Sequence, residues 1–207
     1  MQSKRHTFGP LLIEYQIDKT DVLNKMNEIA KKSKEHETGW LSKVVYYEHH
    51  DMRWFERELE DVFEDYKVKF FDHCNTHKKS EEFMIPKNIY HHYRANLDML
   101  WINYMKSGDY NPPHAHRDCD ISFVVYTDVP KELIEENSKN PVCGPGSVSY
   151  SIGTNFPTHF CPIFDFFPKE NSMFIFPSQL LHYVMPFKSD VIRTSIAGSI
   201  KLEKLFE

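Results

Sequence analysis

From about Leu97 onward, the sequence is divided into short apolar or alternating runs that are separated by Gly, Pro, Asn and Asp. Runs of this length with breaks of this kind are typical of strands in an antiparallel sheet. The runs are DMLWINYM, DISFVVYTDV, GSVSYSI, NSMFIFPS and VIRTSIAGSI. The C-terminal half is therefore predicted to form a β-sandwich or barrel.

The N-terminal half has helical periodicity instead. Residues 18–33 place Val22, Met26 and Ala30 on one helical face, and apolar positions recur at helical spacing from Met52 to about Cys74. Helices followed by a series of short strands indicate the α+β class, in which helices brace one face of the β structure.

The chain of 207 residues fits one domain. We expect residues 1–207 to be a single domain, with 1–95 as mainly helical support and 96–202 as the β core that carries the functional site.

The charge pattern limits the partners. The formal net charge is -5 and there is no extended Lys/Arg block, which argues against binding to a nucleic-acid backbone or an anionic membrane. The N-terminal MQSKRHTFGPLLIEYQ lacks the apolar stretch of a signal peptide, and no window approaches the roughly 20 apolar residues of a membrane span. We therefore expect a cytoplasmic protein.

Four cysteines, Cys74, Cys119, Cys143 and Cys161, stand singly in the sequence without a C-x-x-C pair. This spacing favours reduced thiols over a disulfide framework or a sulfur-ligated metal.

The sequence YNPPHAHRDCD places His114, His116, Asp118 and Asp120 at every second position. Side chains at i and i+2 of a strand share a face and lie about 6.6 Å apart, whereas those at i and i+4 lie about 13 Å apart. A pair that shares one metal ion is therefore either His114 with His116 or His116 with Asp118.

Two imidazoles and one carboxylate form the facial ligand set of non-haem iron(II) oxygenases, and this favours His116 with Asp118. The third ligand is predicted to be His182 in MFIFPSQLLHYVMPF, which follows a strand and a Pro-Ser turn. The alternative for residues 114–120 is a solvated edge strand whose charges discourage association.

Arg193 lies in the β-branched apolar run VIRTSIAG, where burying an unpaired guanidinium would be costly. It needs an anionic partner, and a carboxylate matches the guanidinium fork. Ser195 is on the same strand face and could add a hydrogen bond. The polar segment 131–146, KELIEENSKNPVCGPG, is predicted to be a flexible loop near the mouth of the site.

Four segments together resemble a family of 2-oxoglutarate- and iron-dependent oxygenases of bacteria and their viruses, which is related to prolyl hydroxylases. They are G-D-Y-N-P-P-H-A-H, S-F-V-V-Y, F-P-S-x-L-x-H-x-V-x-P-F and R-x-S-I-A. The similarity is densest from about Trp101 to Ile200.

The resemblance implies a double-stranded β-helix, also called a jelly roll or cupin-like fold, with the metal inside its open end. It implies Fe(II), 2-oxoglutarate and dioxygen as cofactor and cosubstrates, and hydroxylation of a peptidyl or amino-acid-like substrate. It also implies residue roles: His116, Asp118 and His182 on iron, Arg193 and Ser195 on the distal carboxylate of 2-oxoglutarate, and Tyr126 as a further hydrogen-bond donor to it.

Other interpretations stay open at this point. Counting six residues on from Gly108, as in the prolyl-hydroxylase pattern G-x-Y-x-P-H-x-D, gives an all-histidine set of His114, His116 and His182. Such a set would suit a cupin-like dioxygenase or isomerase that does not use 2-oxoglutarate. A binding module that keeps the fold without catalysis is a third possibility.

Overall fold

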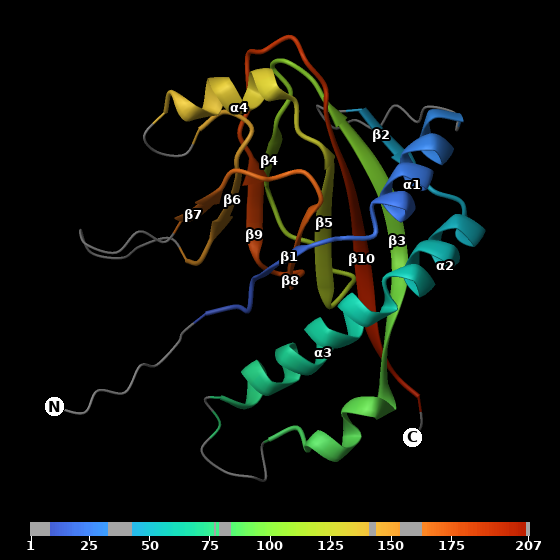
Figure 1. The fold of residues 1–207 in the computed structure, drawn as a ribbon. Coiled ribbons are helices and arrows are strands. Elements are labelled where there is room, and N and C mark those ends of the chain that lie inside the picture. Colours follow the sequence, from blue (N-terminus) through green and yellow to red (C-terminus); the bar gives the residue numbers. More distant parts are fainter. Residues whose placement is uncertain are drawn as a thin grey trace, which may run out of the picture.

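The computed structural model describes residues 9–32, 43–76, 78, 84–140, 144–153 and 163–205. Its strands form two antiparallel sheets (Figure 1). The six-stranded sheet contains, from edge to edge, β1 (Ile13–Gln16), β8 (Ser172–Pro177), β5 (Ile121–Asp128), β10 (Arg193–Lys204), β3 (Tyr93–Met105) and β2 (Lys43–Tyr46). The four-stranded sheet contains β4 (Asn111–His114), β9 (Leu181–Val184), β6 (Val148–Ser151) and β7 (Ile163–Phe166).

The path of the chain between the sheets makes this a double-stranded β-helix. After β3 in the larger sheet the chain enters β4 in the smaller one, returns to β5, crosses again to β6 and β7, and then alternates through β8, β9 and β10. Each of the five predicted runs contains a strand. The strands β2, β7 and β9 were not predicted, since each has only four residues and none has a distinct alternating run.

The helices are α1 (Thr20–Lys32), α2 (His49–Glu58), α3 (Glu60–Asn75) and α4 (Lys131–Ser138), with a 3-10 helix over Lys87–His92. The predicted first helix is confirmed as α1. The prediction of one continuous helix from Met52 to Cys74 was wrong, because the backbone leaves the helical region at Leu59, with φ -112 and ψ 16. Leu59 is fully buried at this break, so the apolar faces of α2 and α3 both reach the sheet.

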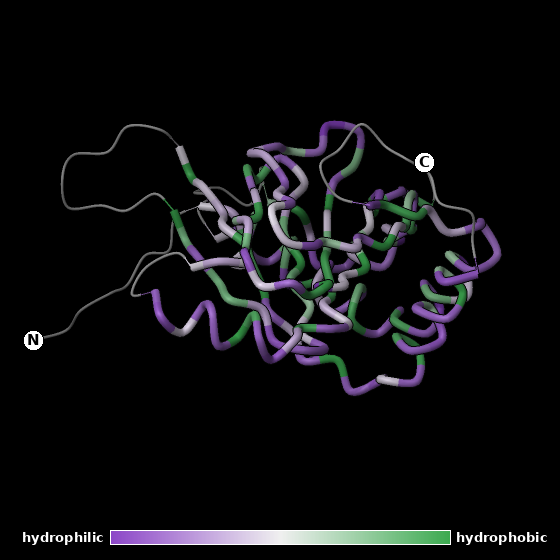
Figure 2. The backbone as a smooth tube through the Cα atoms, turned by 90° about the horizontal axis from the view of Figure 1, so that it is seen from above, coloured by the Kyte–Doolittle hydropathy of each residue, from purple (hydrophilic) through white to green (hydrophobic). Residues whose placement is uncertain are grey.

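The larger sheet has an apolar core on each face. On β5, Phe123 and Val125 belong to the core shared with α1 to α3, whereas Tyr126 belongs to the core between the sheets. The Phe123 ring stacks on Phe55 of α2 at 6.0 Å and meets Phe63 of α3 at 5.2 Å. In Figure 2 the coiled turns of the helices alternate between hydrophobic and hydrophilic residues. The helices thus brace one face and leave the other face for a site.

The segment 131–146 differs from the predicted flexible loop, because its first part is the helix α4. Leu133 is fully buried and anchors this helix. A Cβ atom on Gly146, which has φ +74, would lie 3.0 Å from the Leu133 side chain. The Gly146 carbonyl accepts a hydrogen bond from Arg193 Nη1 at 2.6 Å. The helix therefore packs over the Arg193 end of the barrel.

Two sequence predictions concern the chain as a whole. In the described ranges, no helix is both long and apolar enough to cross a membrane. Cys74 and Cys119 are free thiols, and Cys143 and Cys161 lie outside the described residues.

Candidate functional site

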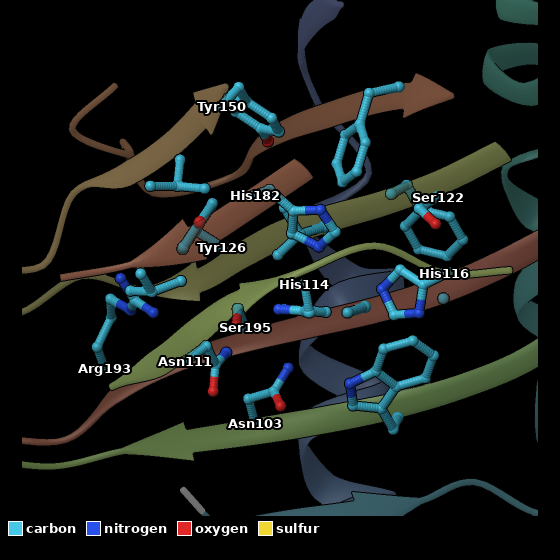
Figure 3. Close-up of a pocket in the computed structure, with 18 residues that line it drawn as sticks. Asn103, Asn111, His114, His116, Ser122, Tyr126, Tyr150, His182, Arg193 and Ser195 are labelled. Carbon is cyan, nitrogen blue, oxygen red and sulfur yellow. The ribbon is translucent and has the colours of Figure 1, made fainter. Parts of the chain in front are cut away.

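Three histidines meet between the two sheets. His114, His116 and His182 each offer a ring nitrogen, and these atoms all lie within 4.8 Å of one another. The ring centroids are 4.3 Å apart for His114 and His182, 5.2 Å for His114 and His116, and 5.3 Å for His116 and His182. Figure 3 shows the three imidazoles facing the same cavity. Their spacing allows one metal ion to bind all three.

Strand pairing explains why these histidines meet. His114 is the last residue of β4 and lies directly opposite His182 of β9. His116 lies beyond the strand, where its backbone N–H donates to the Ser178 carbonyl at 2.9 Å. Its ring is 5.9 Å from that of Trp101 on β3. The predicted meeting of His116 with the distant His182 is therefore what the fold produces.

The imidazoles of His116 and His182 are neutral at physiological pH. Burial, helped by the nearby His114, lowers the pKa of His116 to about 4 and that of His182 to about 3. The Nδ1 atoms of His114 and His182 lie 2.7 Å and 2.8 Å from the carbonyls of Pro112 and Leu180. Because a carbonyl can only accept, each Nδ1 carries the proton and Nε2 is the atom that can bind a metal.

The two aspartates of the motif are not part of the cluster. Asp118 is exposed and lies in a bend, because the regular alternation of β4 stops at His114. Of the two pairs that strand spacing allowed, the structure therefore brings together His114 with His116 and not His116 with Asp118. Asp120 has a structural contact: its Oδ2 accepts from the Leu202 backbone N–H at 2.8 Å.

The cavity beside the histidines is lined by both sheets. On the smaller sheet, one row of paired residues runs His114, His182, Tyr150, and the next row runs Asn111, Val184, Val148. On the larger sheet, Ser195 of β10 pairs with Asn103 of β3 and with Tyr126 of β5. The predicted residues Ser195 and Tyr126 thus lie in the same cavity as the histidines (Figure 3).

Arg193 lines this cavity and is only 2 % exposed. Its Nη1 donates to Gly146, its Nη2 lies 3.0 Å from Met105 Sδ, and its Cζ is 5.1 Å from the Tyr126 ring centroid. Its Nε has no hydrogen-bond partner, and no acidic side chain in the described part of the chain pairs with it. Burial lowers the pKa of Arg193 because this cation lacks a compensating anion.

Among the cavity residues that sequence reasoning missed are Tyr150 and Asn111. Tyr150 lies in the recognised run GSVSYSI, but only its pairing with His182 shows that it faces the cavity. Asn111 belongs to the histidine motif, and its position three residues before His114 could have drawn attention to it.

A second hollow opens beside the first and shares Trp101, Asn103, Asn111, His114 and His116 with it. We call it the outer groove; its remaining lining residues are Val44, Tyr46, Met99 and Ala115. The Tyr46 and Met99 side chains are 45 % and 43 % exposed, and the Tyr46 ring lies 6.3 Å from that of Trp101. None of the described residues that line the groove is acidic or is a lysine or arginine.

This arrangement combines two binding capacities in one cavity. Three imidazole nitrogens at one side can hold a divalent metal ion. A buried guanidinium farther along can bind a carboxylate, with hydroxyl groups beside it. A small molecule with a carboxylate at one end and metal-binding oxygens at the other fits both.

The comparisons with known proteins agree with this geometry. Residues 99–198 match the model of a family described as "Putative 2OG-Fe(II) oxygenase", where 2OG is 2-oxoglutarate. No curated protein sequence matches the chain significantly.

Solved structures with the same fold have low sequence identity. An oxidoreductase of the 2OG-Fe(II) oxygenase family from Burkholderia pseudomallei has a TM-score of 0.58 and 11% identity over 93% of this chain and 85% of that one. A collagen prolyl hydroxylase of Paramecium bursaria Chlorella virus-1, in its 2OG complex, has a TM-score of 0.52 and 15% sequence identity, and the match covers 93% of this chain and 96% of that one. A Pseudomonas putida prolyl-4-hydroxylase has a TM-score of 0.56 and 10% sequence identity, and the match covers 93% of this chain and 92% of that one.

At these identities the structural matches show the fold, which is the predicted double-stranded β-helix. The family model covers β4 to β9 completely, just over half of β3 and half of β10, and so includes each histidine of the cluster as well as Arg193. The resemblance to the 2-oxoglutarate- and iron(II)-dependent oxygenases is thereby confirmed for residues 99–198 of this chain.

Proposed function

We propose that this protein is a non-haem Fe(II)- and 2-oxoglutarate-dependent dioxygenase that hydroxylates an uncharged group of a peptidyl or amino-acid-like substrate. One observation carries the proposal. A single cavity is lined by three clustered imidazoles and by a buried guanidinium that has no acidic partner in the described part of the chain. The first fits a metal, and the second fits the far carboxylate of 2-oxoglutarate.

The residues fit a bound iron(II) ion. His114, His116 and His182 supply three nitrogen ligands, and six-coordinate iron would then keep positions for 2-oxoglutarate and dioxygen. The carbonyls of Pro112 and Leu180 orient two of the imidazoles through their Nδ1–H groups. In this proposal Asp118 is not a ligand.

Arg193 would bind the far carboxylate of 2-oxoglutarate through its Nε and a guanidinium nitrogen, with Ser195 and Tyr126 beside it. When bound, the iron and 2-oxoglutarate supply the chemistry in which dioxygen, 2-oxoglutarate and a substrate C–H group become succinate, carbon dioxide and a C–OH group. The chain itself orients the cosubstrate and, through the apolar surround of Val148, Val184 and Phe176, excludes water.

The outer groove supports the proposed substrate class. It runs into the cavity beside His114 and His116, so a group that lies in it would be next to the metal. The apolar side chains of Tyr46, Met99 and Trp101 line the groove and suit an aliphatic or ring-shaped group. The Asn103 amide can form hydrogen bonds with a peptide-like polar group. Prolyl hydroxylases among the structures of the same fold are consistent with this class.

The three-histidine cluster favours one alternative, a cupin-like metal dioxygenase that does not use 2-oxoglutarate. That enzyme would have no use for a carboxylate site at Arg193. The two functions therefore differ in whether 2-oxoglutarate changes the environment of the iron.

The test uses the full chain loaded with iron(II) without oxygen. Addition of 2-oxoglutarate is expected to produce a visible charge-transfer absorption, and admission of air is expected to yield succinate. The metal-free protein is one control and should give neither signal. An Arg193→Gln variant is the other and should need a higher concentration of 2-oxoglutarate for both signals.

Unchanged iron spectra on addition of 2-oxoglutarate would reject the proposal and favour the cupin-like alternative. Binding of 2-oxoglutarate without any succinate, in the presence of a peptide panel with central Pro, Leu, Asp or Lys, would instead indicate a binding module. Stimulation of succinate formation by the Asp or Lys peptides alone would overturn the uncharged substrate class.

A further inference from the structure

Tyr150 has a buried hydroxyl group that makes no hydrogen bond within the described part of the chain. The residue lies on β6, is 1 % exposed and lines the cavity. Its hydroxyl oxygen has no hydrogen-bond partner among the described residues. Burying a hydroxyl in this way is costly unless a partner arrives, so the group is a candidate for contact with a bound molecule.

The position of Tyr150 relates it to the histidine cluster. It lies directly opposite His182 on β9, which itself lies opposite His114 on β4. Directly opposed residues of an antiparallel pair share a face, so the phenol and both imidazoles point into the same space (Figure 3). The Tyr150 ring is 6.2 Å from the His182 ring.

Aromatic side chains hold the phenol in place. The Tyr150 ring packs edge-on against Phe176 at 4.9 Å and against Phe166 at 6.0 Å. These rings fix its orientation but offer its hydroxyl no acceptor. A rigid, unpartnered donor of this kind would bind a ligand with little loss of conformational freedom.

A second orphaned donor, Arg193 Nε, lines the same cavity. Tyr126 lies between the two: its ring is beside the Arg193 guanidinium, and its ring and that of Tyr150 are each 6.2 Å from the ring of Phe174. Burial raises the pKa of Tyr150 well above its ordinary value, so the phenol keeps its proton and can donate. Two buried donors without an acceptor suit the two oxygens of one carboxylate.

We propose that the Tyr150 hydroxyl donates a hydrogen bond to the far carboxylate of 2-oxoglutarate, together with Arg193. This rests on the proposed function and adds a residue of β6 to the cosubstrate site. The smaller sheet then contributes to both ends of the site, through His114 and His182 for the metal and through Tyr150 for the carboxylate.

The chain offers a matched control in Tyr104. Its hydroxyl is also buried and has no hydrogen-bond partner in the ranges that the structure describes, but Tyr104 does not line the cavity or the outer groove. Tyr150→Phe and Tyr104→Phe therefore each remove one orphaned hydroxyl and keep the ring.

The test measures the Kd of 2-oxoglutarate on the iron(II)-loaded protein without oxygen. Tyr150→Phe is expected to raise this Kd about 10-fold, the size of one hydrogen bond to a charged group, and Tyr104→Phe is expected to leave it unchanged. Iron affinity should be the same in both variants. With 2-oxovalerate, whose methyl group replaces the far carboxylate, Tyr150→Phe and the unaltered protein should bind equally.

Three outcomes would overturn the inference. One is an unchanged Kd in Tyr150→Phe while the unaltered protein binds 2-oxoglutarate, and this would leave the proposed function intact. Another is an equal loss for 2-oxovalerate, which would place the hydroxyl elsewhere on the ligand. Failure of the unaltered protein to bind 2-oxoglutarate would overturn the proposed function and this inference together.

The thermal midpoint of unfolding separates a ligand-binding role from a structural one. In the ligand-free Tyr150→Phe variant this midpoint should not fall, whereas removal of a merely structural hydroxyl would lower it.

Discussion

His114 and His182 face each other directly across β4 and β9, and their ring centroids are 4.3 Å apart. This pairing leaves His116, two residues beyond His114, as the third member of the cluster. Asp118 lies two residues farther on, in a bend and exposed to solvent. The register of β4 against β9 therefore determines which motif residues can share an iron ion.

We expect His114→Ala to weaken iron(II) binding by more than about 100-fold, since loss of a direct ligand should exceed the 10–100-fold effect of outer-shell changes. Asp118→Ala is the matched control from the same motif and should change the affinity by less than about threefold. A competitive chelator titration without oxygen measures both. The reverse pattern would identify His116 with Asp118 as the ligand pair instead.

Much of this site could be predicted from particular residues. The motif YNPPHAHRDCD indicated a cluster that contains His116 and the distant His182, and the apolar run around Arg193 indicated a buried guanidinium that needs an anionic partner. The choice between His114 and Asp118 could not be made, because it depends on where β4 stops being regular. That point is set by pairing with β9, some 70 residues later in the chain.

The same limit applies to the fold. The strands with clear apolar runs were predicted, but β2 and β7 are short and are defined by pairing with β3 and β6. The break between α2 and α3 at Leu59 has no Gly or Pro to mark it. It follows from tertiary packing, because a fully buried leucine at the break allows both helices to reach the sheet.

Arg193→Gln should weaken binding of 2-oxoglutarate by about 30-fold or more, because the charge-assisted contact to its far carboxylate is lost. The glutamine amide can still donate to the Gly146 carbonyl, so the fold should be retained. Arg117→Gln, an exposed arginine beside His116, is the control and should bind 2-oxoglutarate normally. Equal binding by both variants would mean that the buried guanidinium has only a structural role.

Gly198→Ala should lower stability by about 1–3 kcal/mol, as overpacking of a full core does. A Cβ at this position would lie 2.5 Å from the Phe123 ring and 2.8 Å from the Met99 carbonyl oxygen. Phe123 cannot move freely, since it is held between Phe55 and Phe63. Denaturant unfolding measures the change. Ser199→Ala removes a buried hydroxyl that has no hydrogen-bond partner among the described residues, so it should be neutral or stabilising.

Ser178, the residue after β8, contacts both the segment 116–120 and Ser122 of β5. Its Oγ lies 3.0 Å from Cys119 Sγ and 2.9 Å from Ser122 Oγ, while its backbone accepts from His116 N–H and donates to the Asp120 carbonyl. Ser178→Ala should cost about 1–2 kcal/mol of stability, because the buried Ser122 hydroxyl and Cys119 thiol lose this partner.

Iron affinity in Ser178→Ala should stay within about threefold of the unaltered protein, since the backbone bond that positions His116 remains. Ser138→Ala on the exposed end of α4 is the control for both measurements and should change neither. A large loss of iron binding in Ser178→Ala alone would contradict this. It would show that the contacts of the Ser178 hydroxyl with Cys119 and Ser122, and not the backbone hydrogen bond, hold His116 in the cluster.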